Sequence, residues 1–149
     1  MGNGREFLAR RSDVTQAKEY LPGLRDVLLV EDRGFDARRL TATLRLVLGR
    51  NTRIRIADTL DKAIDAVLHS PPDMVFLDDY LEPDDSALET IPMLRRAGYE
   101  RPILVISGEL DRQREIALRK AGADEAIHKD NVDSVNVGEA LVRLFARDG

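Results

Sequence analysis

The stretch Met74-Val75-Phe76-Leu77-Asp78-Asp79 decides how this chain of 149 residues folds. Four apolar residues in succession, preceded by Pro71-Pro72, predict a short strand that is buried on both faces. The strand ends in two acids, and open α/β sheets bind their ligands at the carboxyl ends of the strands. Asp78 is therefore the first candidate functional residue.

Two further apolar runs end in polar residues in the same way. Val27–Val30 leads into Glu31 and Asp32, and Ile103–Ile106 leads into Ser107. Since the carboxyl ends of parallel strands lie along one edge of a sheet, the three runs predict one shared site at that edge.

The other two strands are expected at 53–57, where Ile and Arg alternate as in an edge strand, and at 125–128. Helices fill the intervals between the strands and follow the last one. The first helix is indicated by the spacing of Leu40, Leu44 and Val47 before Gly49, and the second by a cap at Asp58 or Thr59. Ser86 could cap the third helix, but Pro92 is disfavoured inside a helix, so we expect either a start near Thr90 with Pro92 in the first turn or a kink. The last two helices are indicated by Asp111 and the stop at Ala121-Gly122, and by the apolar face of Val137, Leu141 and Leu144.

Strict alternation of strands and helices predicts a parallel sheet. With the apolar strands in the centre, the strand order is 2-1-3-4-5, the doubly wound, flavodoxin-like (βα)5 arrangement of the α/β class. We assign residues 26–149 to this domain. Residues 1–25 form an N-terminal extension, in which Ser12 or Asp13 can cap one helix before Pro22-Gly23.

In this strand order Glu31, Asp32 and Asp78 converge. Three neighbouring carboxylates repel one another unless a cation is present, and a set of oxygen ligands favours Mg²⁺ or Mn²⁺. Ser107 and Lys129, at the ends of the fourth and fifth strands, lie beside Asp78. A hydroxyl and an ammonium group beside such a centre suit a transferred phosphoryl group, whose oxygens need donors and cations.

Together these motifs resemble the receiver domains of response regulators in two-component signalling. The resemblance covers residues 26–147 and is carried by Val30-Glu31-Asp32, Phe76-Leu77-Asp78, Ile106-Ser107-Gly108, and Ala121-Gly122-Ala123-Asp124 with Lys129.

The resemblance implies a role for each of these residues. Asp78 is the phosphoacceptor, and Mg²⁺ is held by Glu31, Asp32, Asp78 and the backbone carbonyl of Tyr80. Ser107 and Lys129 contact the phosphoryl group. Strand alternation turns the neighbouring Asp79 to the opposite face of the sheet.

The resemblance also implies partners. The phosphoryl donor is a sensor histidine kinase or a phosphotransfer protein, which docks near Phe35, Arg38 and Arg39. Because no output domain is recognisable, we expect a stand-alone receiver that signals by protein contact or phosphotransfer, with homodimerisation possible and the downstream protein unknown. Such a chain takes up a phosphoryl group on its own side chain and is not a turnover enzyme. A piece of a larger regulator remains an alternative.

Four features depart from the family pattern. Asp130 follows Lys129 where the family has proline, so a trans peptide bond is expected there. Ala126 replaces an aromatic residue, Tyr80 is bulky, and the loop before Pro83 is longer by one residue. Ala126 and Asp130 favour an alternative, a pseudo-receiver that binds partners without phosphorylation.

Composition excludes other classes. The chain has no cysteine and a net charge of −4. Residues 26–149 hold 18 Lys and Arg against 24 Asp and Glu, which argues against a nucleic-acid surface. No apolar run approaches the ~18 residues of a membrane span, and no secretory signal is visible. We therefore expect a cytoplasmic protein without nucleic-acid or membrane partners.

Overall fold

The computed structural model describes residues 24–146, and its central feature is a five-stranded parallel sheet. The strand order is β2-β1-β3-β6-β7, the order predicted for strands one to five. The strands are β1 (Asp26–Val30), β2 (Arg53–Ala57), β3 (Met74–Asp78), β6 (Ile103–Ser107) and β7 (Glu125–His128). The predicted fold class is confirmed. The helix predicted for the N-terminal extension lies outside the described residues.

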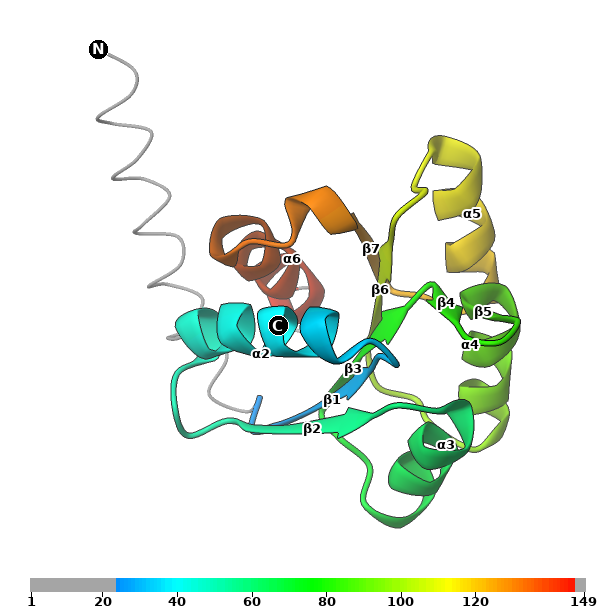
Figure 1. Ribbon diagram of the computed structural model, residues 1–149, viewed down its shortest axis with the longest axis horizontal. Helices are drawn as coiled ribbons and strands as arrows, with labels where there is room; N and C mark the ends of the chain where they lie inside the picture. Colours follow the sequence, from blue (N-terminus) through cyan, green and yellow to red (C-terminus); the bar gives the residue numbers. More distant parts are fainter. Residues whose placement is uncertain (1–23, 147–149) are drawn as a thin grey trace.

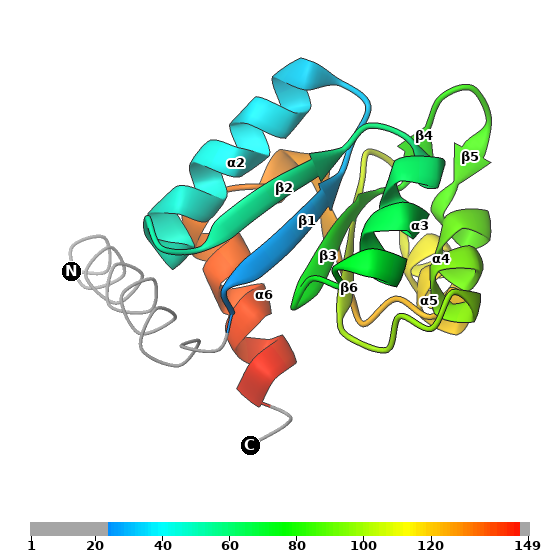
Figure 2. The ribbon, with the colours of Figure 1, turned by 90° about the horizontal axis from the view of Figure 1, so that it is seen from below.

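Five α-helices cover the two faces of this sheet (Figures 1 and 2). One face carries α2 and α6, and the other carries α3, α4 and α5. Their bounds are α2 (Gly34–Leu48), α3 (Leu60–His69), α4 (Ala87–Arg96), α5 (Arg112–Ala121) and α6 (Ser134–Ala146). Within residues 24–146, none of the helices has the length and apolar character needed to cross a bilayer.

Alternate residues of the central strands enter two separate hydrophobic cores. Phe76 packs with residues of α2 and α6, whereas Leu77 packs with residues of α3, α4 and α5. All five residues of β3 are buried, as the apolar run predicts. The same alternation decides the direction of the polar side chains at the strand ends. The side chain of Asp78 lies on the same face of the sheet as Phe76, and that of Asp79 lies on the same face as Leu77.

The helix ends agree with most of the sequence signals. Thr59 and Asp111 cap α3 and α5, and Gly122 ends α5 in the left-handed conformation with φ +119°. For α4 the Ser86 cap is confirmed, and the alternative start near Thr90 is wrong. The helix begins at Ala87 because the Ser86 side chain accepts a hydrogen bond from a backbone N–H of the first turn, and Pro92 lies inside the helix.

A small antiparallel hairpin between β3 and α4 is an addition to the predicted fold. It pairs β4 (Tyr80–Leu81) with β5 (Asp85–Ser86). The hairpin begins two residues after Asp78, so it forms one border of the site at the carboxyl edge of the sheet.

Candidate functional site

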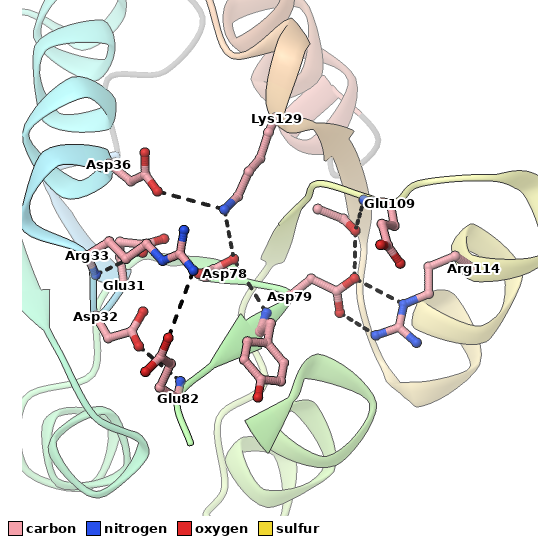
Figure 3. A network of polar contacts seen from close by, with 12 residues as sticks. Glu31, Asp32, Arg33, Asp36, Asp78, Asp79, Glu82, Glu109, Arg114 and Lys129 are labelled. Atoms are coloured by element: carbon pink, nitrogen blue, oxygen red, sulfur yellow. Dashed lines mark hydrogen bonds and ion pairs between the residues drawn. The ribbon is translucent and has the colours of Figure 1, made fainter. Parts of the chain in front are cut away.

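Three acids gather at the carboxyl edge of the central strands (Figure 3). Glu31 and Asp32 follow β1, and Asp78 ends β3. One carboxylate oxygen from each residue lies within 4.8 Å of the other two. Glu31 and Asp78 are only 8% and 6% exposed. The predicted convergence of the three acids is therefore present in the fold.

Burial changes the protonation of this cluster. It raises the pKa of Glu31 from 4.5 to about 8, and the negative charge of Asp78 adds to the rise. Burial also raises the pKa of Asp78, but a hydrogen bond with Glu31 and the charge of Lys129 oppose that rise. The shared hydrogen bond raises the pKa of Glu31 and lowers that of Asp78, so it favours Glu31 as the residue of the pair that carries a proton.

The two oxygens of Asp32 have different surroundings. Oδ2 accepts a hydrogen bond from the backbone N–H of Glu82 at 2.9 Å. Oδ1 is buried and has no hydrogen-bond partner among the described residues. An unpartnered buried carboxylate oxygen beside two further carboxylates fits a hard divalent cation. The side chains present therefore suit Mg²⁺ or Mn²⁺.

Tyr80 borders this cluster through its backbone. Its N–H donates to Asp78 Oδ1 at 3.4 Å, and its side chain is 48% exposed. Ligation by its carbonyl group stays a prediction, as do the metal-binding roles of the acids.

Lys129 lies beside Asp78 and also beside an acid that the sequence did not single out. Its Nζ is 3.8 Å from Asp78 Oδ1 and 3.8 Å from Asp36 Oδ2 of helix α2. The lysine begins a 3₁₀ turn, η1 (Lys129–Asn131). Among the described residues the cis peptide bond is that before Pro83, so the bond between Lys129 and Asp130 is trans, as expected.

Ser107 makes its strongest contact with Asp79, not with Asp78. Its hydroxyl donates to Asp79 Oδ2 at 2.6 Å. Arg114, from the first turn of α5, holds the same carboxylate with two bonds, Nη2 to Oδ1 at 2.6 Å and Nε to Oδ2 at 3.0 Å. Asp79 is 7% exposed, and its hydrogen bonds raise the pKa of Arg114.

The alternation of side chains in the strands explains this pairing. Ser107 belongs to the face that carries Val105, and Asp79 to the face that carries Leu77. Asp79 does point away from Asp78, as predicted, but its partners were not anticipated. The sequence did contain a signal for a partner of Asp79, because a buried acid at the end of a central strand requires a cation, and the helices on that face can supply one. Those helices carry several arginines, so the sequence alone could not identify Arg114 as the partner.

A cleft of about 390 Å³ joins these groups. Asp78 and Asp79 lie in it together with the three cations that surround the site, Arg33, Arg114 and Lys129. Tyr80, Ser107, Gly108 and Glu109 complete its lining. Because the Asp79 carboxylate is paired with Arg114, the remaining cations of the cleft, Arg33 and Lys129, can hold a small anion against Asp78.

Comparisons with known proteins agree with this geometry. Residues 27–139 match the family model of the response regulator receiver domain. The receiver domain of the Francisella response regulator 1452 superposes with a TM-score of 0.69 at 17% identity, covering 84% of this chain and 99% of that one. The signal receiver domain of a putative Luxo repressor protein from Vibrio parahaemolyticus superposes with a TM-score of 0.68 at 23% sequence identity, covering 83% of this chain and 95% of that one.

A longer protein, NtrX from Brucella abortus, superposes with a TM-score of 0.71 at 22% identity, covering 82% of this chain and 27% of that one. At these identities the solved structures show the fold alone, and no curated protein sequence matches the chain. The family itself follows from the sequence model, which spans most of the chain. This chain belongs to the response regulator receiver domain family of two-component signalling.

Proposed function

We propose that the chain accepts a phosphoryl group on Asp78 from a phosphohistidine of a sensor histidine kinase or a phosphotransfer protein. The observation that carries the proposal is the position of this carboxylate. Asp78 is buried at the end of a central strand, yet it lines the cleft, with Lys129 Nζ at 3.8 Å and two more acids within reach of a shared cation.

The transfer requires an ionised Asp78. One of its carboxylate oxygens attacks phosphorus, and the new O–P bond forms while the P–N bond to the donor imidazole breaks. The bonding electron pair stays on the imidazole nitrogen. Burial raises the pKa of Asp78, but its hydrogen bond with Glu31 and the charge of Lys129 lower it, so both contacts favour the ionised form that attacks. Lys129 lies where its charge offsets that of the incoming group.

Glu31, Asp32 and Asp78 would hold Mg²⁺, with the Tyr80 carbonyl as a further ligand. When bound, the ion would offset the charge of the carboxylates and polarise the phosphoryl oxygens. Asp32 Oδ1 is the ligand atom best prepared for it, since it is buried and lacks a partner in the described part of the chain. Ser107 and Lys129 would contact the transferred group.

The donor would dock beside helix α2, where Phe35, three residues after Asp32, is 70% exposed. The phosphorylated chain would signal by protein contact, as a monomer or a homodimer, or by passing the group on, and would work in the cytoplasm. It would not turn over a substrate, since the phosphoryl group ends on its own side chain. In this proposal residues 1–25 are an extension to the receiver domain of 26–149.

The test is incubation with Mg²⁺ and acetyl phosphate, followed by intact mass measurement. The wild type should gain one phosphoryl group, and D78A should gain none. D79N is the matched control, because it changes the neighbouring acid and keeps Asp78, and it should still be labelled. Equal labelling of wild type and D78A would refute Asp78 as the acceptor.

The second candidate is a pseudo-receiver that binds a partner without phosphorylation. It is favoured by the Ser107 hydroxyl, which already donates to Asp79, and by Ala126 in place of an aromatic residue. Tight Mg²⁺ binding without any adduct, even with a histidine kinase as donor, would support this candidate over the first.

A further inference from the structure

The Ser107 hydroxyl carries a single proton, and that proton is already in use. It is donated to Asp79 Oδ2 at 2.6 Å, while the Ser107 oxygen accepts from the backbone N–H of Glu109 at 3.2 Å. A phosphoryl group offers only acceptors. Ser107 can therefore donate to Asp79 or to a phosphoryl group on Asp78, but one proton does not serve both fully.

The Asp79 carboxylate also has a partner besides Ser107. Both its oxygens accept hydrogen bonds from Arg114, so it stays in a bidentate ion pair when the Ser107 hydroxyl turns away from it. Without Arg114, a buried and unpaired Asp79 would hold Ser107 more firmly and would repel an incoming anion in the same cleft.

We propose that Asp79 and Arg114 are positioning residues for phosphoryl transfer. In the unphosphorylated chain, Asp79 holds the Ser107 hydroxyl away from Asp78. Arg114 donates to the same carboxylate and offsets its charge, which weakens the hydrogen bond between Ser107 and Asp79. When Asp78 is phosphorylated, the Ser107 hydroxyl therefore turns from Asp79 to the phosphoryl group. The pair sets how readily Asp78 is phosphorylated. This inference rests on the proposed function, because it concerns the same phosphoacceptor.

The decisive experiment is a double-mutant cycle of D79N and S107A. The ratio of phosphorylated to unphosphorylated protein is measured by intact mass at a fixed acetyl phosphate concentration with saturating Mg²⁺. Asparagine keeps the shape of Asp79 but accepts a weaker, uncharged hydrogen bond. D79N should raise the ratio about fivefold in the Ser107 background, since charged and neutral hydrogen bonds differ by about that factor.

Loss of a negative charge near the phosphoryl group would also raise the ratio, and the cycle separates the two causes. A positioning role predicts that most of the D79N effect disappears in the S107A background. An equal effect in both backgrounds would overturn the proposal. E109Q is the matched control, because it removes another carboxylate from the cleft and should have the same effect with or without the Ser107 side chain.

R114Q should change the ratio of phosphorylated to unphosphorylated protein in the opposite direction from D79N. It should lower the phosphorylated fraction, and an R114Q protein that is labelled as readily as wild type would contradict the role of Arg114. Thermal denaturation and Mg²⁺ affinity check that each variant is folded with its acid cluster intact.

A measurement on the wild type covers the case in which D79N does not fold. The Arg114 Nε–H signal in nuclear magnetic resonance spectra should shift on phosphorylation in the wild type and not in S107A. A shift of equal size in both would overturn the proposal. If the wild type takes up no phosphoryl group, the proposed function fails. If labelling on Asp78 proceeds but Asp79 and Ser107 do not couple, only the positioning role fails.

Discussion

Magnesium binding to the acid cluster should depend steeply on pH. Burial raises the pKa of Glu31 to about 8, and a carboxyl group must lose its proton before it can ligate a metal. At pH 7 about one molecule in eleven has Glu31 ionised, and at pH 6 about one in a hundred. The apparent dissociation constant should therefore rise about tenfold for each pH unit below 8.

Isothermal titration calorimetry with MgCl₂ between pH 6 and pH 8.5 measures this dependence. At pH 7, two buffers with different ionisation heats should reveal the release of about 0.9 proton for each ion bound. E31Q cannot ionise at this position, so its affinity should be nearly independent of pH over the same range. E109Q, which leaves the cluster unchanged, should keep the wild-type dependence. A wild-type affinity that changes less than about twofold between pH 6.5 and pH 8 would refute the protonated Glu31.

The same proton affects the stability of the metal-free protein. Because the folded-state pKa of Glu31, about 8, lies above its ordinary value of 4.5, the protonated group stabilises the fold at low pH. That contribution falls as the pH rises from 4.5 through 8. The metal-free protein should melt at a lower temperature at pH 8.5 than at pH 6.5, and Mg²⁺ should remove most of the difference. A higher melting temperature at pH 8.5 without metal would contradict this account.

Three substitutions test other parts of the structure. Tyr80 stands half-exposed at the cleft, so Y80N should admit water and shorten the lifetime of phosphorylated Asp78 several-fold, and an unchanged rate of adduct loss would contradict this. G122A should destabilise the fold by about 1–2 kcal/mol in chemical denaturation, because φ is +119° and the new Cβ would lie 3.0 Å from an Ile91 methyl carbon. D36N frees Lys129 from a competing acid and should speed acetyl phosphate labelling about twofold, whereas slower labelling would show that Asp36 positions the lysine.

The fold was predictable because its signals are local and agree with one another. The uninterrupted apolar residues of β1, β3 and β6 require burial on both faces, which leaves the edges to β2 and β7. Caps such as Thr59 and Asp111 act within one helical turn, so the sequence contains both partners of each hydrogen bond. The acid cluster was predictable for a related reason, since strand order alone brings the ends of β1 and β3 together.

The partners of Asp79 were not predictable in the same way. Asp79 and Arg114 are 35 residues apart, and their ion pair depends on the rotation of α5 about its axis. A helix with few buried residues fixes that rotation only weakly in its sequence. The start of α4 was misjudged for a different reason. The disfavoured position of Pro92 was given more weight than the cap at Ser86, and the folded chain keeps both.

The divided surroundings of Asp32 restrict what can replace it. One oxygen accepts from the Glu82 amide of the hairpin, and the other is buried without a partner in the described structure, facing the acid cluster. A carboxylate is symmetric, so it serves both sides at once. An asparagine of the same shape is not: if its oxygen meets the amide, its NH₂ group faces the cluster, and if it is flipped, two N–H donors oppose each other at the hairpin. D32N, the substitution closest in shape, must therefore lose either the hydrogen bond from the Glu82 amide or the oxygen that faces the acid cluster. The chemical symmetry of this side chain, more than its charge alone, joins the hairpin to the acid cluster.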